Sequence, residues 1–311
     1  MTSTIASARH RQLPIADASG APTRAVIMRG PNPTARSSRR AFARAVHTPT
    51  GPGAMLIEWT VGGDATATAW GPGRDWLLEI APRWLGRHDD PTGFDPSIDP
   101  RVHRAAKLHG EVRLAASGVI WQEILAVILG QRVTTREAAR SFRRIVDAWG
   151  EPAPGPLGLH LPPTSGVMAE RSYVDLHRMN VERRRADAIL LAARRANRLE
   201  EAATMSLPDA LRRLSALPGL GVWTATATVG ACHGDPDTIV LRDYGLPTMV
   251  NYFFTGDPRR LPADEGGDDA MIAHLEPWRG HRQRVVQLIK RAGPKPPRRA
   301  PRAFNPDIRR L

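Results

Sequence analysis

The stretch LPGLGVWTA at residues 217–225 decides the fold of this chain. Its two glycines, Gly219 and Gly221, stand two apart, behind a proline and ahead of a run rich in alanine and threonine. Glycine adopts a positive φ without steric cost, so the pattern predicts a tight hairpin between two helices. Backbone N–H groups at the start of the second helix, at the positive end of its dipole, can bind a phosphate. An ordinary helical hairpin with a glycine cap is the alternative interpretation of this stretch alone.

The chain after this hairpin returns to an acidic residue. GDPD at residues 234–237 predicts a turn, and the apolar run TIVL at 238–241 predicts an extended segment that leads to Asp243. Asp243 follows Trp223 by twenty residues, enough for one helix and one extended return. That path can bring the carboxylate back beside the hairpin.

Together these motifs resemble the helix-hairpin-helix/Gly-Pro-Asp superfamily of DNA glycosylases, specifically its alkylation-repair branch, the 3-methyladenine DNA glycosylase II type. Three further segments agree with that branch, namely ILGQ at 128–131, WTA at 223–225 and PWR at 277–279. The resemblance covers roughly residues 100–292. It implies a mainly α fold of two helical subdomains with an α+β N-terminal lobe. It also implies double-stranded DNA containing damaged bases as the partner.

Composition agrees with a nucleic-acid partner. The 311 residues carry a net charge of +13 with a pI near 11.2, and phosphate contacts made by such a chain release counterions. A compositional bias toward arginine is the alternative, because the chain has only three lysines, Lys107, Lys290 and Lys295. The single cysteine, Cys232, excludes an internal disulfide and a cysteine-ligated iron–sulfur cluster, and is expected to be a small buried hydrophobic residue.

No apolar run approaches the length of a membrane span, and the first twenty residues lack the apolar core of a secretory signal. We therefore expect a cytoplasmic, nucleoid-associated protein without a membrane segment. A monomer is expected, because a damaged site on duplex DNA has no two-fold symmetry to match. No cofactor is expected.

The chain divides into four parts. Residues 1–21 are expected to form a disordered tail, and residues 22–95 an α+β lobe with strands at 41–48, 54–60 and 65–70 and a helix at 71–86. A Pro/Asp/Gly-rich junction at 89–100 leads into a helical domain at 96–293, which contains the hairpin at 206–233. The segment 150–165 reads as a Pro/Gly loop. Residues 294–311 form a basic Pro/Arg tail, which either touches phosphates or only solubilises the chain.

Local patterns define several helices of this domain. Thr134 followed by Glu137 predicts a capping box, and Ser206 followed by Asp209 predicts the cap of the first hairpin helix. Ile120, Ile124 and Ile128 predict one stripe of a buried helix. Residues 181–199 predict an amphipathic helix whose arginines 183, 184 and 185 face outward.

The resemblance assigns catalysis to Asp243. Hydrolysis of an N-glycosidic bond develops positive charge on the sugar, and a carboxylate beneath it stabilises that charge and orients or deprotonates water. A helix starting after Tyr244 would favour the anion through its dipole. Asp235 and Asp237 are the competing carboxylates, and their Gly-Asp-Pro-Asp setting is more typical of a turn.

Position 223 decides the subtype. The bifunctional branch of the superfamily carries a lysine there, whereas this chain carries Trp223, which offers no amine for covalent catalysis. The resemblance implies that Trp223 lines the base pocket, where an aromatic face suits an electron-poor alkylated base; a core tryptophan is the alternative. The family's pocket aromatics are replaced by Ala227 and Gln287, which puts the substrate range in doubt. Among the residues that can compensate are Trp121, Tyr173 and Tyr244.

Base flipping requires a residue to fill the gap. By resemblance Arg132 is the candidate wedge, with Gln131 beside it, and Thr134 a phosphate contact. The hairpin supplies Gly219, Gly221 and Thr224. A monovalent cation on the backbone of Leu217, Leu220 and Val222 is also consistent with the family; the histidines are too scattered for a divalent site.

The sequence thus predicts a monofunctional DNA glycosylase that excises alkylated purines of the 3-methyladenine type from duplex DNA. Two alternatives stand beside it. One is a non-catalytic helix-hairpin-helix module that binds DNA or senses damage. The other is a glycosylase for a deaminated or oxidised base.

Overall fold

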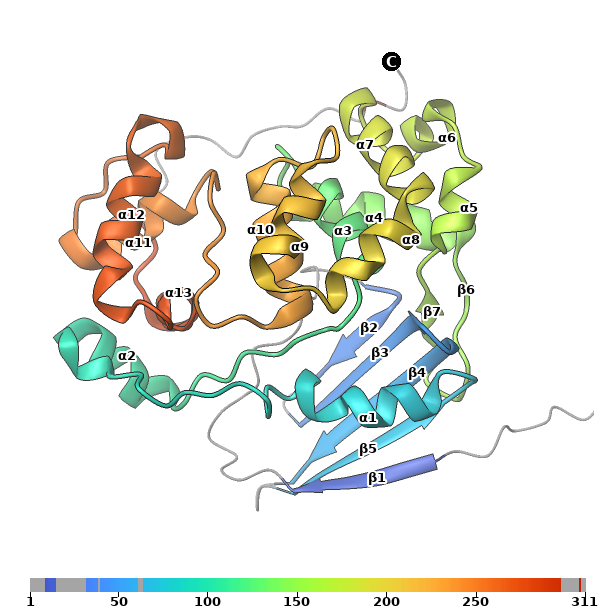
Figure 1. The fold of residues 1–311 in the computed structure, drawn as a ribbon, viewed down its shortest axis with the longest axis horizontal. Helices are drawn as coiled ribbons and strands as arrows, with labels where there is room; N and C mark the ends of the chain where they lie inside the picture. The colour runs from blue at the N-terminus through green and yellow to red at the C-terminus, as the bar shows by residue number, and fades with distance from the viewer. Residues whose placement is uncertain (1–8, 15–31, 39, 61–63, 298–307, 309–311) are drawn as a thin grey trace, which may run out of the picture.

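Five antiparallel strands form the N-terminal lobe of the computed structural model, which describes residues 9–14, 32–38, 40–60, 64–297 and 308 (Figure 1). The strands lie in the order β1-β5-β4-β3-β2. Their bounds are Arg9–Pro14 for β1, Ala35–Ser37 for β2, Ala41–Thr48 for β3, Gly51–Trp59 for β4 and Asp64–Trp70 for β5.

One helix covers this sheet. Helix α1, Arg74–Trp84, packs on β4 and β5 through Leu77, Ile80 and Trp84. The facing residues of β5 are the small alanines 65, 67 and 69, which are fully buried and let the helix approach closely. The helix begins three residues later than the sequence suggested, because Gly71 has a φ of 92° and Pro72 and Gly73 turn the chain before it.

Six residues of the segment predicted as an N-terminal tail form a strand. Part of residues 1–21 lies outside the described residues, but Arg9–Pro14 form the edge strand β1, paired with β5 from Arg9↔Ala69 to Pro14↔Asp64. The prediction of disorder was wrong for these six residues. An edge strand joins a sheet through backbone hydrogen bonds and needs no apolar run of its own, so the composition gave no signal.

The helical part has two hydrophobic clusters, in agreement with two subdomains. The first is built by α3 (Trp121–Leu129), α4 (Thr135–Trp149), α5 (Ser165–Ala169), α6 (Tyr173–Arg178), α7 (Arg183–Arg194), α8 (Ala196–Glu200), α9 (Leu207–Ser215) and α10 (Val222–His233). The second is built by α2 (Pro100–His109), α11 (Leu246–Thr255), α12 (Gly267–Leu275) and α13 (Arg282–Ala292).

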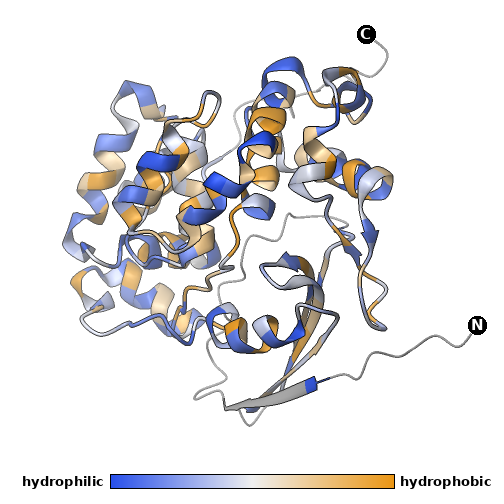
Figure 2. Cartoon of the chain, turned by 45° about the vertical axis from the view of Figure 1, so that its right-hand side comes forward, coloured by the Kyte–Doolittle hydropathy of each residue, from blue (hydrophilic) through white to orange (hydrophobic). Residues whose placement is uncertain are grey.

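Short elements connect these helices. The segment predicted as a plain loop contains a two-stranded ribbon of β6, Glu151–Pro152, and β7, His160–Leu161, with β7 beside β3 of the N-terminal lobe. Within the described residues, 3₁₀ turns lie at Pro96–Ile98, Glu201–Ala203, Ala263–Glu265 and Glu276–Trp278. Many helices of the molecule carry both hydrophobic and hydrophilic residues, as expected of amphipathic helices around a core (Figure 2). None of the described helices is long and apolar enough to cross a bilayer.

Helix α3 is the centre of the first subdomain, and all nine of its residues are buried. Its start is capped from a distance: the carboxylate of Glu200 accepts hydrogen bonds from the backbone N–H groups of Ile120 and Trp121, at 2.8 and 2.9 Å. Burial raises the pKa of Glu200, and these two donors oppose only part of that rise.

The N-terminal lobe is joined to α3 by a buried ion pair. Arg44 of β3 donates to Glu123 of α3 at 2.8 Å, and both side chains are less than a tenth exposed. Beside this pair, the Gln122 side chain donates to the carbonyl oxygen of His47. The lobe is therefore fixed to the helix that leads to the candidate site.

The predicted junction at 89–100 contains a second buried pair. Asp89 accepts from both terminal nitrogens of the fully buried Arg284 on α13, and also from the N–H of Leu114. The junction is thus not only a linker, because its first residue is part of the packing of the second subdomain.

Candidate active site at the mouth of the hairpin

The glycine-rich stretch forms the predicted hairpin between α9 and α10. Gly219 has a φ of 85°, and a Cβ at this position would lie 2.8 Å from the Cβ of Ala188, so both backbone conformation and space require glycine. Gly221 differs from the expectation. It is extended, with φ −68° and ψ −179°, and a Cβ there would meet nothing within 4 Å.

Gly221 is the N-cap of α10 and has no side chain to cap the first turn. The first backbone hydrogen bond of the helix runs from the N–H of Ala225 to the carbonyl of Gly221. The N–H groups of residues 222–224 therefore point out of the helix end, where they can bind an anion.

Asp243 lies beside this hairpin. Its Oδ2 accepts a hydrogen bond of 2.9 Å from the indole N–H of Trp223 on α10. Its Oδ1 accepts from the N–H groups of Gly245 and Leu246, at 2.9 and 2.8 Å, at the start of α11. Three donors fix the carboxylate at a helix N-terminus, where the dipole favours negative charge.

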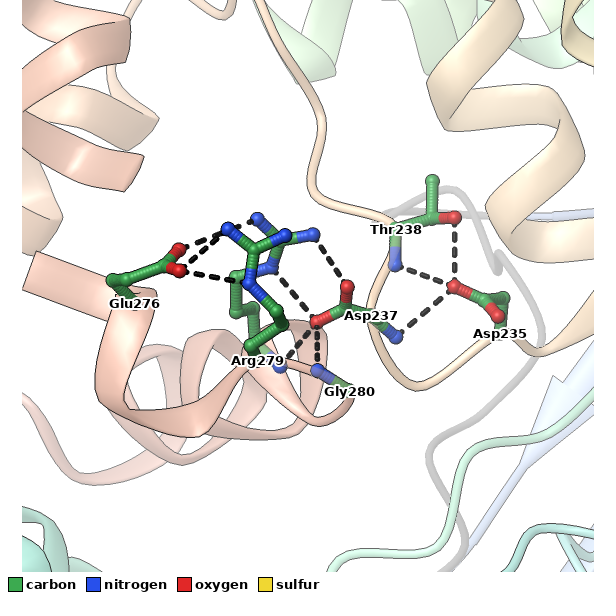
Figure 3. A network of polar contacts seen from close by, with 7 residues as sticks. Asp235, Asp237, Thr238, Glu276, Arg279 and Gly280 are labelled. Atoms are coloured by element: carbon green, nitrogen blue, oxygen red, sulfur yellow. Dashed lines mark hydrogen bonds and ion pairs between the residues drawn. The ribbon is translucent and has the colours of Figure 1, made fainter. Parts of the chain in front are cut away.

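The segment that brings Asp243 back is held by a network of polar contacts (Figure 3). Asp235 accepts from the N–H groups of Asp237 and Thr238 and from the Thr238 hydroxyl, which makes the predicted turn. Asp237 pairs with Arg282 of α13 and accepts from the N–H of Gly280. Both competing carboxylates are thus engaged in holding the loop.

Arg242, the residue directly before Asp243, has a φ of 57°, which is unfavourable for a residue with a side chain. Its N–H donates to Oδ2 of Asp268 on α12 at 2.9 Å. The backbone immediately before Asp243 is therefore fixed from the second subdomain, while the Arg242 side chain is exposed.

The turn between α3 and α4 contacts the hairpin from the other side. The side chain of Gln131 donates to the carbonyl of Gly219 at 3.0 Å and to the hydroxyl of Thr224 at 2.9 Å. A Cβ at Gly130 would lie 3.5 Å from the Trp223 ring. Gln131 is therefore tied to the hairpin, and Thr224, which is 2% exposed, presents its side chain to Gln131 rather than to the surface. The sequence had placed both side chains on the DNA-binding surface.

Arg132 and Thr134 are exposed on this turn. Arg132 has a φ of 57°, so its backbone is held in the left-handed region. Thr134 is the N-cap of α4, and its hydroxyl oxygen accepts from the N–H of Glu137, which is one half of the predicted capping box. The hydroxyl proton of Thr134 is still able to donate to a phosphate.

The remaining predicted pocket residues lie elsewhere. Trp121 is a core residue at the first position of α3, with its indole N–H donated to the carbonyl of Pro163. Helix α3 has nine residues, and it is its other end, at Leu129, that reaches the site. Trp121 is therefore separated from the site by the length of this helix, about 13 Å. Tyr244 is 77% exposed, and Arg260 lies 4.4 Å from its ring centre. The prediction that Trp121 lines the base pocket is thus wrong. The sequence could not show this, because an aromatic residue of a core helix and one that lines a pocket have the same pattern of neighbouring hydrophobic residues.

The proposed cation site is not formed by all three predicted carbonyls. The carbonyl of Val222 accepts from the Thr226 hydroxyl along α10, because carbonyls in a helix point toward its C-terminus. The carbonyl of Leu217 accepts from the N–H of Leu220. Among the described residues no group of three or more His, Cys, Asp or Glu side chains is placed to hold a metal ion. Cys232 is buried, and burial raises the pKa of its thiol.

Sequence reasoning missed one residue that supports the site. Arg185 was expected to face outward with Arg183 and Arg184, but it is 2% exposed and donates to the carbonyl of Leu129 at the end of α3. Helical spacing gave a usable signal, because residue 185 lies one turn before the buried residues Ala188 and Ile189.

Comparison with known proteins places these observations in context. No protein-family model matches the chain. Over 174 residues, 55% of this chain, it is 25% identical to a Bacillus subtilis protein named "Putative DNA-3-methyladenine glycosylase YfjP", and it covers 58% of that protein. Over 158 residues, 50% of this chain, it is 30% identical to Mycobacterium tuberculosis AlkA, named as a bifunctional transcriptional activator/DNA repair enzyme, and covers 30% of it. The match spans less than two thirds of either relative.

Solved structures share the fold. A 3-methyladenine DNA glycosylase from Archaeoglobus fulgidus matches with a TM-score of 0.67 and 17% identity, over 83% of this chain and 88% of that one. MBOgg1 in complex with a low-affinity DNA ligand matches with a TM-score of 0.64 and 14% identity, over 80% of this chain and 83% of that one. Schizosaccharomyces pombe Mag1 in complex with abasic DNA matches with 0.51 and 17% identity, over 62% and 91%.

The chain therefore has the helix-hairpin-helix DNA glycosylase fold, and part of its sequence is similar to the proteins named YfjP and AlkA.

Proposed function

We propose that this chain is a monofunctional DNA glycosylase, which hydrolyses the N-glycosidic bond of alkylated purines of the 3-methyladenine type in duplex DNA. The observation that carries the proposal is the 2.9 Å hydrogen bond from the Trp223 indole to the Asp243 carboxylate, directly beside the hairpin. An acid and an aromatic ring are thus paired at the mouth of an anion-binding helix end. The names of the relatives agree with this activity.

In this mechanism Asp243 is the catalytic residue. As the base leaves, positive charge develops on the sugar, and the carboxylate stabilises that charge from below. With Oδ1 engaged by two backbone donors and Oδ2 by Trp223, the carboxylate is already oriented before the substrate binds. The same carboxylate can orient or deprotonate the attacking water, and the proton then resides on Asp243.

Flipping of the damaged base is assigned to two loops. The N–H groups at the start of α10 bind a backbone phosphate near the flipped nucleotide. Arg132, exposed at the turn after α3, fills the gap in the base stack. Its left-handed backbone supports this role, because such strain occurs most often at functional sites. The ring of Trp223 stacks on the electron-poor alkylated base.

The absence of strand cleavage is part of the proposal. A nick through a Schiff base requires an amine at the reacting sugar, and position 223 holds tryptophan. The three lysines of the chain lie on α2, on α13 and at position 295. The expected product is therefore an intact strand with an abasic site.

The test compares the wild type with Asp243→Asn on duplexes that contain alkylated, deaminated, oxidised or abasic sites. We expect the wild type to release free base from alkylated DNA, and the variant to lose at least about a hundredfold in rate while binding the duplex normally. Asp269→Asn is the matched control, because Asp269 is exposed on the first turn of α12 and should leave the rate unchanged.

Equal behaviour of the wild type and Asp243→Asn in every assay would show a non-catalytic DNA-binding protein instead. Release of only a deaminated or oxidised base would keep the chemistry and change the substrate. Strand cleavage by the wild type without added alkali would contradict a monofunctional enzyme.

A further inference from the structure

A groove of about 660 Å³ is lined by residues of α8 and α9 and by Leu217, the residue that enters the hairpin. We name it the α8–α9 groove. Four arginines line it, Arg195, Arg198, Arg212 and Arg213, against one acid, Asp209. Neither Trp223 nor Asp243 lines it, so this groove is distinct from the candidate active site.

Two of the four arginines are already engaged. Arg212 pairs with Asp209, and Arg213 pairs with Glu201 and also donates to the carbonyl of Arg198. The guanidinium groups of Arg195 and Arg198 are different. Both residues are exposed, and within the described residues no hydrogen bond joins either side chain to a carboxylate. Arg198 is close enough to Glu201 that its charge, after the hydrogen bond from Arg213, helps to lower the pKa of that carboxyl. The groove therefore presents two cations that face solvent.

The groove continues a surface to which phosphate binding has already been assigned. Leu217 is part of its lining, and Gly219 of the hairpin follows two residues later. Helix α9 has nine residues and is about 13 Å long, which equals the rise of about four base pairs of duplex DNA. The lining of the groove therefore adjoins the hairpin that is proposed to hold the duplex, and its length matches a few base pairs on one flank.

We propose that the α8–α9 groove binds the backbone phosphates of the duplex on one flank of the damaged site, with Arg195 and Arg198 as the main contacts. The proposal rests on the proposed function, because it needs DNA at the hairpin. Half-buried Met205 and buried Leu199 on the groove wall fit the apolar edges of deoxyribose. An acidic protein segment is the competing occupant, and continuity with the hairpin favours DNA.

The experiment measures how the binding constant depends on salt for the wild type and for Arg195→Gln/Arg198→Gln. Each phosphate contact contributes about 0.9 to the slope of log K against log salt, so the variant should lose about two units of slope on a long duplex. The matched control is Arg104→Gln/Lys107→Gln, which removes the same charge from exposed positions of α2. The control should keep the wild-type slope.

Two truncated duplexes locate the contact. Each has the damaged base about three base pairs from one end, which is shorter than the reach of the groove. We expect the difference between variant and wild type to disappear on one truncated duplex and to persist on the other. Base release from the duplex without that flank should be unchanged in the variant.

An unchanged slope on the long duplex would overturn the proposal. A difference that persists on both truncated duplexes would overturn it as well, because the arginines would then contact DNA at the damage itself. Failure of the proposed function would be seen in a different measurement. A wild type that binds DNA but releases no base would disprove the glycosylase activity, while the salt dependence of binding could still be compared between the wild type and the variant.

Discussion

The pair of Trp223 and Asp243 is the smallest unit of the site, and it joins two segments that the chain brings together over twenty residues. The tryptophan has two separable roles. Its N–H donates to the carboxylate of Asp243, and its ring, which lies beside Gly130, is proposed to stack on the damaged base. These roles belong to different atoms, so a substitution can remove one and keep most of the other.

Trp223→Phe removes the indole N–H and keeps an aromatic ring. A hydrogen bond to a charged group contributes about 1.5–3 kcal/mol, so base release should slow by about tenfold to a hundredfold. Binding of damaged duplex should remain close to that of the wild type. Single-turnover release and a binding titration on the same duplex provide the measurement.

Trp149→Phe is the control for this change, because Trp149 lies at the end of α4, outside the residues that contact Asp243. It should leave the release rate unaltered. Equal release by Trp223→Phe and the wild type would mean that the indole donor does not orient the carboxylate during the reaction.

At the scale of elements, the loop from Asp235 to Asp243 is held by its contacts with α13. Burial alone would raise the pKa of Asp237, but the hydrogen bonds and the positive charge of Arg282, with the N–H of Gly280, outweigh burial and lower it. A carboxyl group whose pKa is lowered by folding binds fewer protons in the folded state than in the unfolded one. It therefore stabilises the fold above its unfolded pKa, and this contribution is lost as the pH falls through the lower folded pKa.

Asp237→Asn should consequently be less stable than the wild type at pH 7, and the difference should shrink as the pH falls below about 4. Urea unfolding of both proteins at several pH values measures this difference, and the carboxyl groups common to both cancel. For Asp269→Asn the difference should stay near zero throughout. A gap between wild type and Asp237→Asn that is the same at pH 7 and at pH 3 would contradict the role of the ionised pair.

The elements also show what the sequence can and cannot predict. The hairpin and the return to Asp243 were predictable, because the positive φ at Gly219 and the turn at Asp235 are local requirements of the chain. The bond from Gln131 to the hairpin was not, since an amide near a phosphate site can serve DNA or protein and only the tertiary arrangement decides. Trp121 was assigned wrongly for a similar reason, because burial in a core and exposure in a pocket favour the same ring.

The strand at Arg9–Pro14 was not predicted for another reason. An edge strand forms through backbone hydrogen bonds to its neighbour, here β5, so its own residue pattern need not indicate a strand. The predicted strand 41–48 was confirmed residue for residue, since its neighbours on both sides and the helix above it impose burial on that strand.

At the scale of the whole molecule, the N-terminal lobe carries no part of the candidate site, yet it is joined to α3 through Arg44 and Glu123. Glu123→Gln would leave the charge of Arg44 buried without its partner, at a cost of about 3–5 kcal/mol in the free energy of unfolding. Replacing both residues with methionine should recover most of that loss, because two apolar side chains leave no charge in the interior.

Urea unfolding of the three proteins gives the comparison. Asp147→Asn serves as the control, since it breaks the exposed pair with Arg143 and should change stability by less than about 1 kcal/mol. If Glu123→Gln were as mild as that control, the lobe and the helical part would not be coupled through this pair.

The two hydrogen bonds of Gln131 have a mechanical consequence. They join the end of α3 to the glycine turn. In the proposed mechanism, a force on the sugar–phosphate chain bound at the turn would therefore be transmitted to Arg132, the residue proposed to enter the base stack. Binding of the DNA backbone and flipping of the nucleotide would then occur in one movement rather than in two. The loop that carries Asp243 is held separately, by contacts with α12 and α13, and would keep its position during base flipping.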